Sequence, residues 1–265
     1  MNPIDRLFAE FRAAKQTAFI PFLPAGDPDL AFTAEALPAL AGAGASLIEI
    51  GFPFSDPIAD GPVIQASYTR ALAKGLKVES IFETVKTATS SPEWKTPVVA
   101  MASYSLVWRK GPEAFLHEAK ASGISGIVAP DLPAEEADDF AAMCRDREVK
   151  LILLVTPTTD PKRAERIVKS CSGFVYVVGV VGITGARASL AVDLPAHLAR
   201  LRTLTDLPLC VGFGVSTPEH VKSLKGIADG VIVGSALVKK MDTPDRAAAL
   251  SGMTKLAKEL AAATR

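Results

Sequence analysis

The stretch 48-IEIGFPFSDPIADG-61 closes a short apolar run at residues 45–50 and holds two acids, Glu49 and Asp60, at opposite ends of a loop punctuated by glycine and proline. A strand of this composition is expected to be buried. An ionised glutamate in a buried strand is costly unless it is paired or faces a polar cavity. Glu49 and Asp60 therefore predict a functional site where this strand ends.

Apolar runs of similar length recur along the chain, and amphipathic segments with helical spacing separate them. The eight predicted strands are residues 17–23, 45–50, 97–102, 124–129, 149–155, 174–178, 207–211 and 230–233. The predicted helices include residues 30–43, 113–121, 134–145, 161–170, 194–204 and 218–224. Eight strand–helix units predict an α/β fold, the (β/α)8 TIM barrel.

The interval between the second and third predicted strands is longer than the other intervals. It holds the loop that carries Asp60 and a predicted helix at residues 63–74, ahead of the usual helix at 79–89. Residues 1–15 also have helical spacing. We therefore expect a single TIM-barrel domain over residues 1–265, with an extra N-terminal helix and an insertion after strand 2.

The composition excludes several classes of function. Lys and Arg (29) balance Asp and Glu (29), so no net charge favours nucleic acid or a membrane surface. No apolar run resembles a signal peptide or approaches the ~20 residues of a membrane span, so we expect a cytoplasmic protein. The three cysteines lack CxxC spacing and are predicted to be packing residues. The three histidines lack HxH or HExxH spacing and fall in predicted helical segments, so no metal site is predicted.

Chemistry in a TIM barrel takes place at the C-terminal ends of the strands. The predicted ends are Pro24, Glu49, Ser103, Asp131, Thr156, Gly179, Gly212 and Gly234. Lysine and histidine are absent from this set, which disfavours Schiff-base and metal chemistry and leaves acid–base catalysis by carboxyl groups. Asp131 is predicted to be structural, capping the helix after strand four.

The last three strands lead into glycine-rich turns, VVGVVGITGAR (177–187), VGFGVS (211–216) and VGSAL (233–237). Glycine lets backbone N–H groups approach an anion closely, and a helix N-terminus adds partial positive charge. TIM barrels often bind phosphate after strands seven and eight. The turns favour a phosphorylated substrate over the alternative of tight turns alone, with Gly214, Gly234 and Ser235 as binding residues.

The segments FLPAGDPD, IEIGFPFSDPIADGPVIQ, PDLP, GITGAR, GFGVS and VGSA occur in this order, and with them the chain resembles the α subunit of tryptophan synthase over nearly its whole length. The resemblance implies a carbon–carbon lyase that cleaves indole-3-glycerol phosphate to indole and D-glyceraldehyde 3-phosphate in L-tryptophan biosynthesis. It implies no cofactor in this subunit. It also implies a β subunit with pyridoxal phosphate, which receives the indole within an αββα heterotetramer.

The resemblance assigns roles to the candidate residues. Glu49 would be the general acid that protonates C3 of the indole ring and then acts as a base, while Asp60 would stay ionised and accept the indole N–H. The matching substrate-binding positions are Phe22, Tyr176, Phe213 and, in a mobile loop after strand six, Thr184 and Gly185. Asp56 matches a contact to the β subunit, although a turn-forming role before Pro57 explains it equally well.

Four residues depart from the family pattern. Ser103 and Ser105 stand where the family has tyrosine and asparagine, and Gly179 and Val180 stand where it has serine and a polar or basic residue. Two other functions stay open: a different phosphate-binding barrel enzyme, and a non-catalytic module that switches a partner subunit. Strand ends without lysine or histidine argue against the first alternative, and the presence of Glu49, Asp60 and Thr184 argues against the second.

Overall fold

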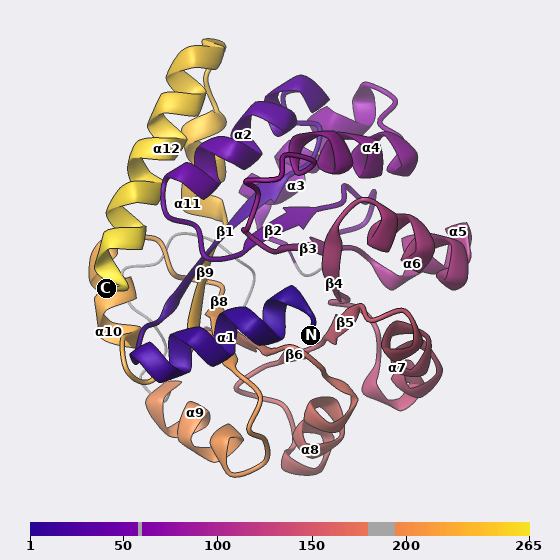
Figure 1. The fold of residues 1–265 in the computed structure, drawn as a ribbon, viewed down its shortest axis with the longest axis vertical. Helices are drawn as coiled ribbons and strands as arrows, with labels where there is room; N and C mark the ends of the chain where they lie inside the picture. The colour runs from indigo at the N-terminus through magenta and orange to yellow at the C-terminus, as the bar shows by residue number, and fades with distance from the viewer. Residues whose placement is uncertain (58–59, 180–193) are drawn as a thin grey trace.

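The computed structural model describes residues 1–57, 60–179 and 194–265. A parallel sheet curves into a nearly closed barrel at the centre of the molecule, and helices surround it (Figure 1). Helices between the strands return the chain over the outside of the barrel, as parallel pairing requires. The predicted α/β fold of the TIM-barrel type is confirmed.

The strands in the described residues are β1 (Ala18–Pro24), β2 (Ile48–Gly51), β3 (Val98–Met101), β4 (Ile124–Val128), β5 (Lys150–Ile152), β6 (Leu154–Val155), β7 (Val175–Val178), β8 (Leu209–Gly212) and β9 (Gly230–Val233). Their order around the sheet is β5-β4-β3-β2-β1-β9-β8-β7-β6. The predicted strand boundaries agree with these to within three residues.

The prediction of one continuous strand at residues 149–155 is wrong. The segment is divided at Leu153, so that β5 pairs with β4 and β6 pairs with β7. The Leu153 N–H donates to Cys171 Sγ at 3.3 Å, while the Leu153 carbonyl accepts from the Tyr176 N–H at 3.1 Å. The backbone thus changes its pairing partner at this residue.

The α-helices are α1 (Pro3–Ala14), α2 (Leu30–Gly42), α3 (Pro62–Ala73), α4 (Val78–Ala88), α5 (Tyr104–Lys110), α6 (Pro112–Ala121), α7 (Ala137–Asp146), α8 (Pro161–Ser170), α9 (Leu194–Arg202), α10 (Pro218–Leu224), α11 (Ser235–Val238) and α12 (Arg246–Ala263). The predicted N-terminal helix and the inserted helix are confirmed as α1 and α3. The predicted helix at 134–145 begins as a 3₁₀ turn, η1 (Ala134–Glu136), and continues as α7.

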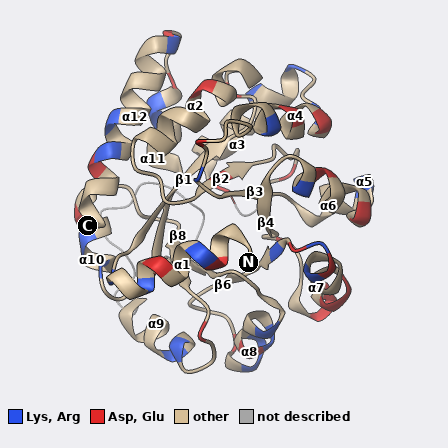
Figure 2. Cartoon of the chain, in the orientation of Figure 1, with Lys and Arg blue, Asp and Glu red and all other residues tan. Residues whose placement is uncertain are grey.

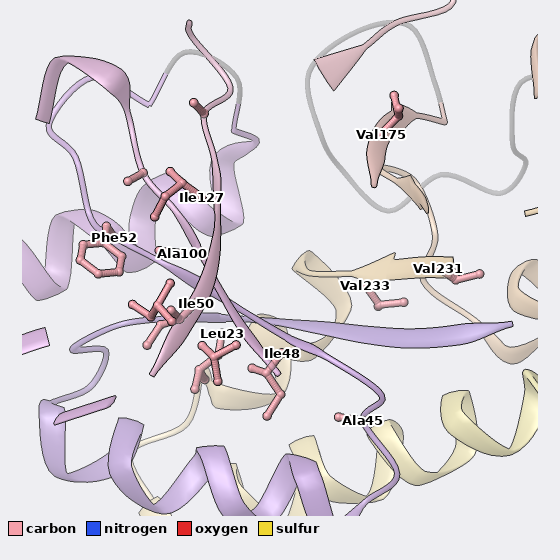
Figure 3. Packing of buried hydrophobic residues seen from close by; sticks show 14 of the residues in the cluster. Leu23, Ala45, Ile48, Ile50, Phe52, Ala100, Ile127, Val175, Val231 and Val233 are labelled. Atoms are coloured by element: carbon pink, nitrogen blue, oxygen red, sulfur yellow. The ribbon is translucent and has the colours of Figure 1, made fainter. Parts of the chain in front are cut away.

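Side chains alternate between the two faces of each strand, and this alternation divides the apolar residues into two clusters. Outward-facing residues such as Leu23 and Ile50 pack in the layer between strands and helices (Figure 3). Inward-facing residues such as Ile20 fill the barrel itself. Most of the apolar burial that stabilises the fold therefore lies outside the barrel, in the layer beneath the helices.

The same alternation determines where Glu49 points. Its neighbours Ile48 and Ile50 belong to the outer cluster, so Glu49 faces the barrel interior. In register, Phe22 of β1 lies on one side of Glu49 and Val99 of β3 on the other. The pleat of β2 alone thus places a carboxyl group among apolar side chains inside the barrel.

Helix α1 covers one end of the barrel (Figure 1). Ile4 and Phe8 are buried there, and the Phe8 ring lies 5.9 Å from that of Phe174, just before β7 begins. The covered end therefore holds the starts of the strands. The opposite end, where the strands finish, is left to the loops that carry the candidate site.

Lysine and arginine are interspersed with aspartate and glutamate over the outer helices (Figure 2). The mixed distribution of positive and negative side chains agrees with the formal net charge of zero that the sequence gives. Within the described residues, no helix combines the length and apolar character needed to cross a membrane.

An ion pair between the buried Asp27 and the partly exposed Arg70 ties α3 to the segment that follows β1. Asp27 is 3% exposed and accepts hydrogen bonds from Arg70 Nε at 3.0 Å, Arg70 Nη2 at 2.6 Å and Ser67 Oγ at 2.6 Å. All three donors lie on α3. Because α3 begins directly after Asp60, this pair also sets the position of the loop that carries Asp60.

We expect Arg70→Ala to lower the free energy of unfolding by about 2 kcal/mol, because Asp27 would stay buried with one side-chain donor. Arg163→Ala is the matched control. Its ion pair with Glu135 spans 3.4 Å between side chains that are 53% and 48% exposed, so a loss below about 1 kcal/mol is expected. Urea unfolding measures both values, and equal losses would contradict a larger contribution from the ion pair of the buried Asp27.

Candidate active site

A pocket of about 520 Å³, open solvent included, lies at the end of the barrel where the strands finish. The predicted residues that line it are Phe22, Asp60, Tyr176, Phe213, Gly214, Gly234 and Ser235. They come from β1, β7, the loop before α3 and the segments after β8 and β9. Residues far apart in the sequence are therefore brought together around one space.

Glu49 is 1% exposed, and neither of its carboxyl oxygens has a hydrogen-bond partner in the described part of the chain. Burial, and to a smaller extent the charge of Asp60, raise the pKa of Glu49 from 4.5 to about 8. The group therefore carries a proton at neutral pH. A buried carboxyl that keeps its proton is suited to general acid catalysis.

Asp60 is 5% exposed and lines the pocket. Its N–H donates to the Pro57 carbonyl at 3.0 Å, and its own carbonyl accepts from Gln65 Nε2 at 2.7 Å, which fixes the turn into α3. Burial raises the pKa of Asp60 from 3.8 to about 7. A negative charge on Asp60 disfavours a second negative charge on Glu49. As pH rises, Asp60 therefore loses its proton first and Glu49 retains its own.

Two aromatic side chains form one wall of the pocket. The rings of Tyr176 and Phe213 lie 5.6 Å apart at 64°, an edge-to-face arrangement that aromatic pairs favour. Phe213 has a φ of +63°, which is uncommon for an aromatic residue, and Gly214 follows with a φ of +87°. The sharp turn after β8 is therefore what directs the Phe213 ring at Tyr176.

A polar corner of the same pocket lies where β9 passes into α11. The Gly234 carbonyl accepts from the N–H groups of Leu237 at 2.8 Å and Val238 at 3.1 Å. The earlier N–H groups of α11, at Ser235 and Ala236, have no partner within the helix, as at any helix start. With Gly214 and Ser216 on the same pocket, this corner offers donors to an anion.

Gly179, one of the departures from the family pattern, lies where two backbones approach closely. Its N–H donates to the Gly212 carbonyl at 2.7 Å, and a Cβ at this position would lie 2.8 Å from the Phe213 carbonyl oxygen. A side chain here would displace the turn that carries Phe213. Glycine at position 179 therefore follows from local packing.

The prediction that Asp131 caps the helix after strand four is wrong. Asp131 Oδ1 accepts from the Tyr104 N–H at 2.7 Å, and Oδ2 accepts from Ser103 Oγ at 2.6 Å, so it caps α5 after β3. Adjacent parallel strands end side by side, which brings the loop after β4 to the start of α5. Ser103 is buried in this contact, whereas Ser105 is exposed on α5.

A second pocket, of about 370 Å³ with open solvent included, adjoins the first and shares Asp60 and Met101 with it. Its lining includes Asp56, which is exposed, and Ser103 and Tyr68. Tyr68 was not predicted as a site residue. The signal was present in the predicted helix at 63–74, since Ile64, Tyr68 and Ala71 recur at helical spacing and form its buried face.

The remaining predictions concern the loop after strand six, the histidines and a metal site. Thr184, Gly185 and Val180 lie outside the described residues. The histidines lie in helices, at His117, His197 and His220, as expected. Among residues 1–57, 60–179 and 194–265, no group of three or more His, Cys, Asp or Glu side chains could hold a metal ion.

Comparisons with known proteins agree on one family. The family model for the tryptophan synthase alpha chain matches residues 8–265. The tryptophan synthase alpha chain of Synechocystis sp. is 47% identical over 242 residues, which cover 91% of each chain. That of Trichormus variabilis is 42% identical and covers 100% of this chain and 99% of its own. A structure of Mycobacterium tuberculosis tryptophan synthase aligns with a TM-score of 0.90 at 34% identity, covering 99% and 98% of the chains.

The raised pKa values of Glu49 and Asp60 predict how stability depends on pH. Between about pH 4 and 8 the folded protein binds more protons than the unfolded chain, so the free energy of unfolding falls as pH rises. We expect Glu49→Gln, which cannot ionise, to lose less stability from pH 5 to pH 8 than wild type, by at least about 2 kcal/mol.

Urea unfolding at pH 5, 6.5 and 8 measures this dependence. Glu113→Gln is the control, because the Glu113 side chain is 74% exposed, and its curve should parallel that of wild type. A Glu49→Gln curve parallel to wild type would show that Glu49 does not ionise with a raised pKa.

Proposed function

This chain belongs to the tryptophan synthase alpha chain family, and we propose that Glu49 and Asp60 carry out the family's reaction at the mouth of its barrel. That reaction is the cleavage of indole-3-glycerol phosphate to indole and D-glyceraldehyde 3-phosphate, a step of L-tryptophan biosynthesis. It needs no cofactor in this subunit, since pyridoxal phosphate belongs to the β subunit.

The proposal depends most on the buried carboxyl group of Glu49. Breaking the carbon–carbon bond requires a group that accepts its electron pair, and an indole ring protonated at C3 is such a group. Glu49, with a pKa of about 8, holds the required proton at neutral pH. After donating it, the Glu49 carboxylate acts as the base that removes the proton from the glycerol hydroxyl as the chain is cleaved.

Asp60 has the complementary role. Protonation at C3 places positive charge on the ring, which extends to the indole nitrogen. An ionised Asp60 that accepts the indole N–H stabilises this charge, and the low dielectric around a 5% exposed side chain strengthens the interaction. The two carboxyl groups thus have different roles because Asp60 loses its proton before Glu49 does.

The remaining pocket residues orient the substrate. Phe22, Tyr176 and Phe213 offer aromatic faces and edges to the indole ring. The corner formed by Gly214, Gly234 and Ser235 offers backbone and hydroxyl donors to the phosphate. We also propose that Thr184 and Gly185 contribute to closing the site, on the basis of the family resemblance alone.

The family implies a β-subunit partner, and we propose that the two chains form an αββα heterotetramer. Exposed Asp56, which lines the second pocket, is the proposed contact with that partner. We further propose that residues 1–265 act as one domain, since one sheet and its helices extend from residue 3 to residue 263. The cytoplasmic location stays a prediction from the sequence.

We expect Glu49→Gln to lower kcat for indole release by about 10³-fold, because the general acid is lost, and Asp60→Asn to lower it by about 10²-fold, because charge stabilisation is lost. Indole released from indole-3-glycerol phosphate is measured with and without the β subunit. Glu135→Gln, an exposed surface change, should leave the rate unchanged. A wild-type rate for Glu49→Gln would remove Glu49 from the reaction.

The phosphate corner predicts a different kinetic effect. Ser235→Ala removes one hydroxyl donor that acts on a group far from the reacting bond, so we expect KM to rise about tenfold with kcat nearly unchanged. Inhibition by inorganic phosphate should weaken in parallel. The control is Ser223→Ala, whose exposed hydroxyl bonds within α10. An unchanged KM for Ser235→Ala would place the phosphate elsewhere.

A further inference from the structure

A buried tyrosine, Tyr68, adjoins the two carboxyl groups and has no part in the mechanism described above. It is 3% exposed and belongs to the buried face of α3. Within the described residues its hydroxyl makes no hydrogen bond, although it lines the second pocket together with Asp60. A hydroxyl without a partner on the wall of a pocket is available to donate a hydrogen bond there.

The position of the Tyr68 hydroxyl is fixed from two sides. A Cβ at Gly51 would overlap both the Tyr68 hydroxyl oxygen and the Phe22 ring, so the hydroxyl lies against the end of β2. Gly51 follows Glu49 by two residues and faces the same side of the strand. From the other side, helical side chains lean toward the helix N-terminus, so Tyr68 leans back along α3 toward Asp60.

The chemistry of this hydroxyl is restricted by its surroundings. Burial, followed by the charges of Asp60 and Glu49, raises the pKa of Tyr68 well above 10. The phenol therefore stays neutral throughout the working pH range and keeps its proton. Beside two carboxyl groups, a neutral phenol can donate a hydrogen bond to whichever of them is ionised.

We propose that Tyr68 is a positioning residue of the lyase site: in the substrate complex its hydroxyl, which has no partner among the described residues of this structure, donates to the ionised Asp60 carboxylate, and its ring excludes water from the space beside Glu49. The inference deepens the proposed function and rests on it. The donor holds the Asp60 oxygens in the orientation that accepts the indole N–H. Ser103 lines the same pocket, and Tyr68 provides the phenol there.

Two substitutions at this position separate the roles of the hydroxyl and the ring. Tyr68→Phe removes only the donor, so the Asp60 carboxylate is less stabilised and the pKa of Asp60 should rise by about one unit. Tyr68→Ala removes the ring, so water enters and the pKa of Glu49 should fall toward its ordinary value. The two variants are therefore expected to shift carboxyl titrations in opposite directions.

Carboxyl titrations followed by ¹³C NMR measure these shifts directly, with resonances assigned from Glu49→Gln and Asp60→Asn. In parallel, kcat/KM for indole-3-glycerol phosphate should fall about tenfold in Tyr68→Phe, with its acidic limb moved to higher pH. Tyr104→Phe is the matched control. Its ring packs on Phe140, away from both pockets, and it should titrate and react as wild type does.

Unshifted titrations and an unshifted pH profile in Tyr68→Phe would overturn the inference. The inference would also be overturned if Tyr68→Phe lost activity and thermal stability together while its pH profile stayed that of wild type, because this is the result expected of a purely structural role. If Tyr68→Ala fails to fold, the Tyr68→Phe result decides alone. The titrations need no activity, so a failure of the proposed lyase reaction, shown by an active Glu49→Gln, is distinguishable from a failure of the Tyr68 assignment.

Discussion

The burial of the Glu49 carboxyl group, which has no hydrogen-bond partner among the described residues, is the constraint on which the rest of this structure depends. Glu49 faces the barrel interior because β2 is pleated, and a charge there would be costly. The protein tolerates Glu49 by keeping it protonated near neutral pH. In the proposed mechanism that protonation makes the group useful, because a carboxyl group that still holds its proton near neutral pH can donate it to the substrate.

The residues that contribute most of the apolar burial lie apart from the candidate site. The fold therefore stays stable despite the free-energy cost of burying Glu49. The larger apolar cluster lies between strands and helices, outside the barrel, while the smaller interior cluster surrounds the site. Helix α1 covers the end where strands start, and the Asp27–Arg70 pair anchors the inserted helix α3 at the other end. Substitutions at the mouth therefore change the reaction while most of the apolar burial stays intact.

The sequence was sufficient for the parts of the fold that depend on local pattern. The spacing of apolar runs predicted the barrel, and the long interval after residue 50 predicted α3. The division at Leu153 and the helix capped by Asp131 could not be predicted, because each depends on a neighbour brought close by the fold. Glu49 and Asp60 were predicted as candidates because their loop is distinctive. Tyr68, which lines the second pocket, was not predicted, because its spacing looks the same as that of a packing residue.

Two of the four expected departures from the family pattern, Gly179 and Ser103, are explained by the neighbouring backbone. Gly179 leaves room for the Phe213 carbonyl, so a larger residue there would displace an aromatic wall of the pocket. Ser103 bonds to Asp131, whose other oxygen caps α5, so its hydroxyl serves the loops that frame the mouth. Both changes alter how the rim is built and leave Glu49 in its dry position. In the proposed mechanism the chemistry depends on the environment of two carboxyl groups, so the site can accept such changes provided that the rim still excludes water.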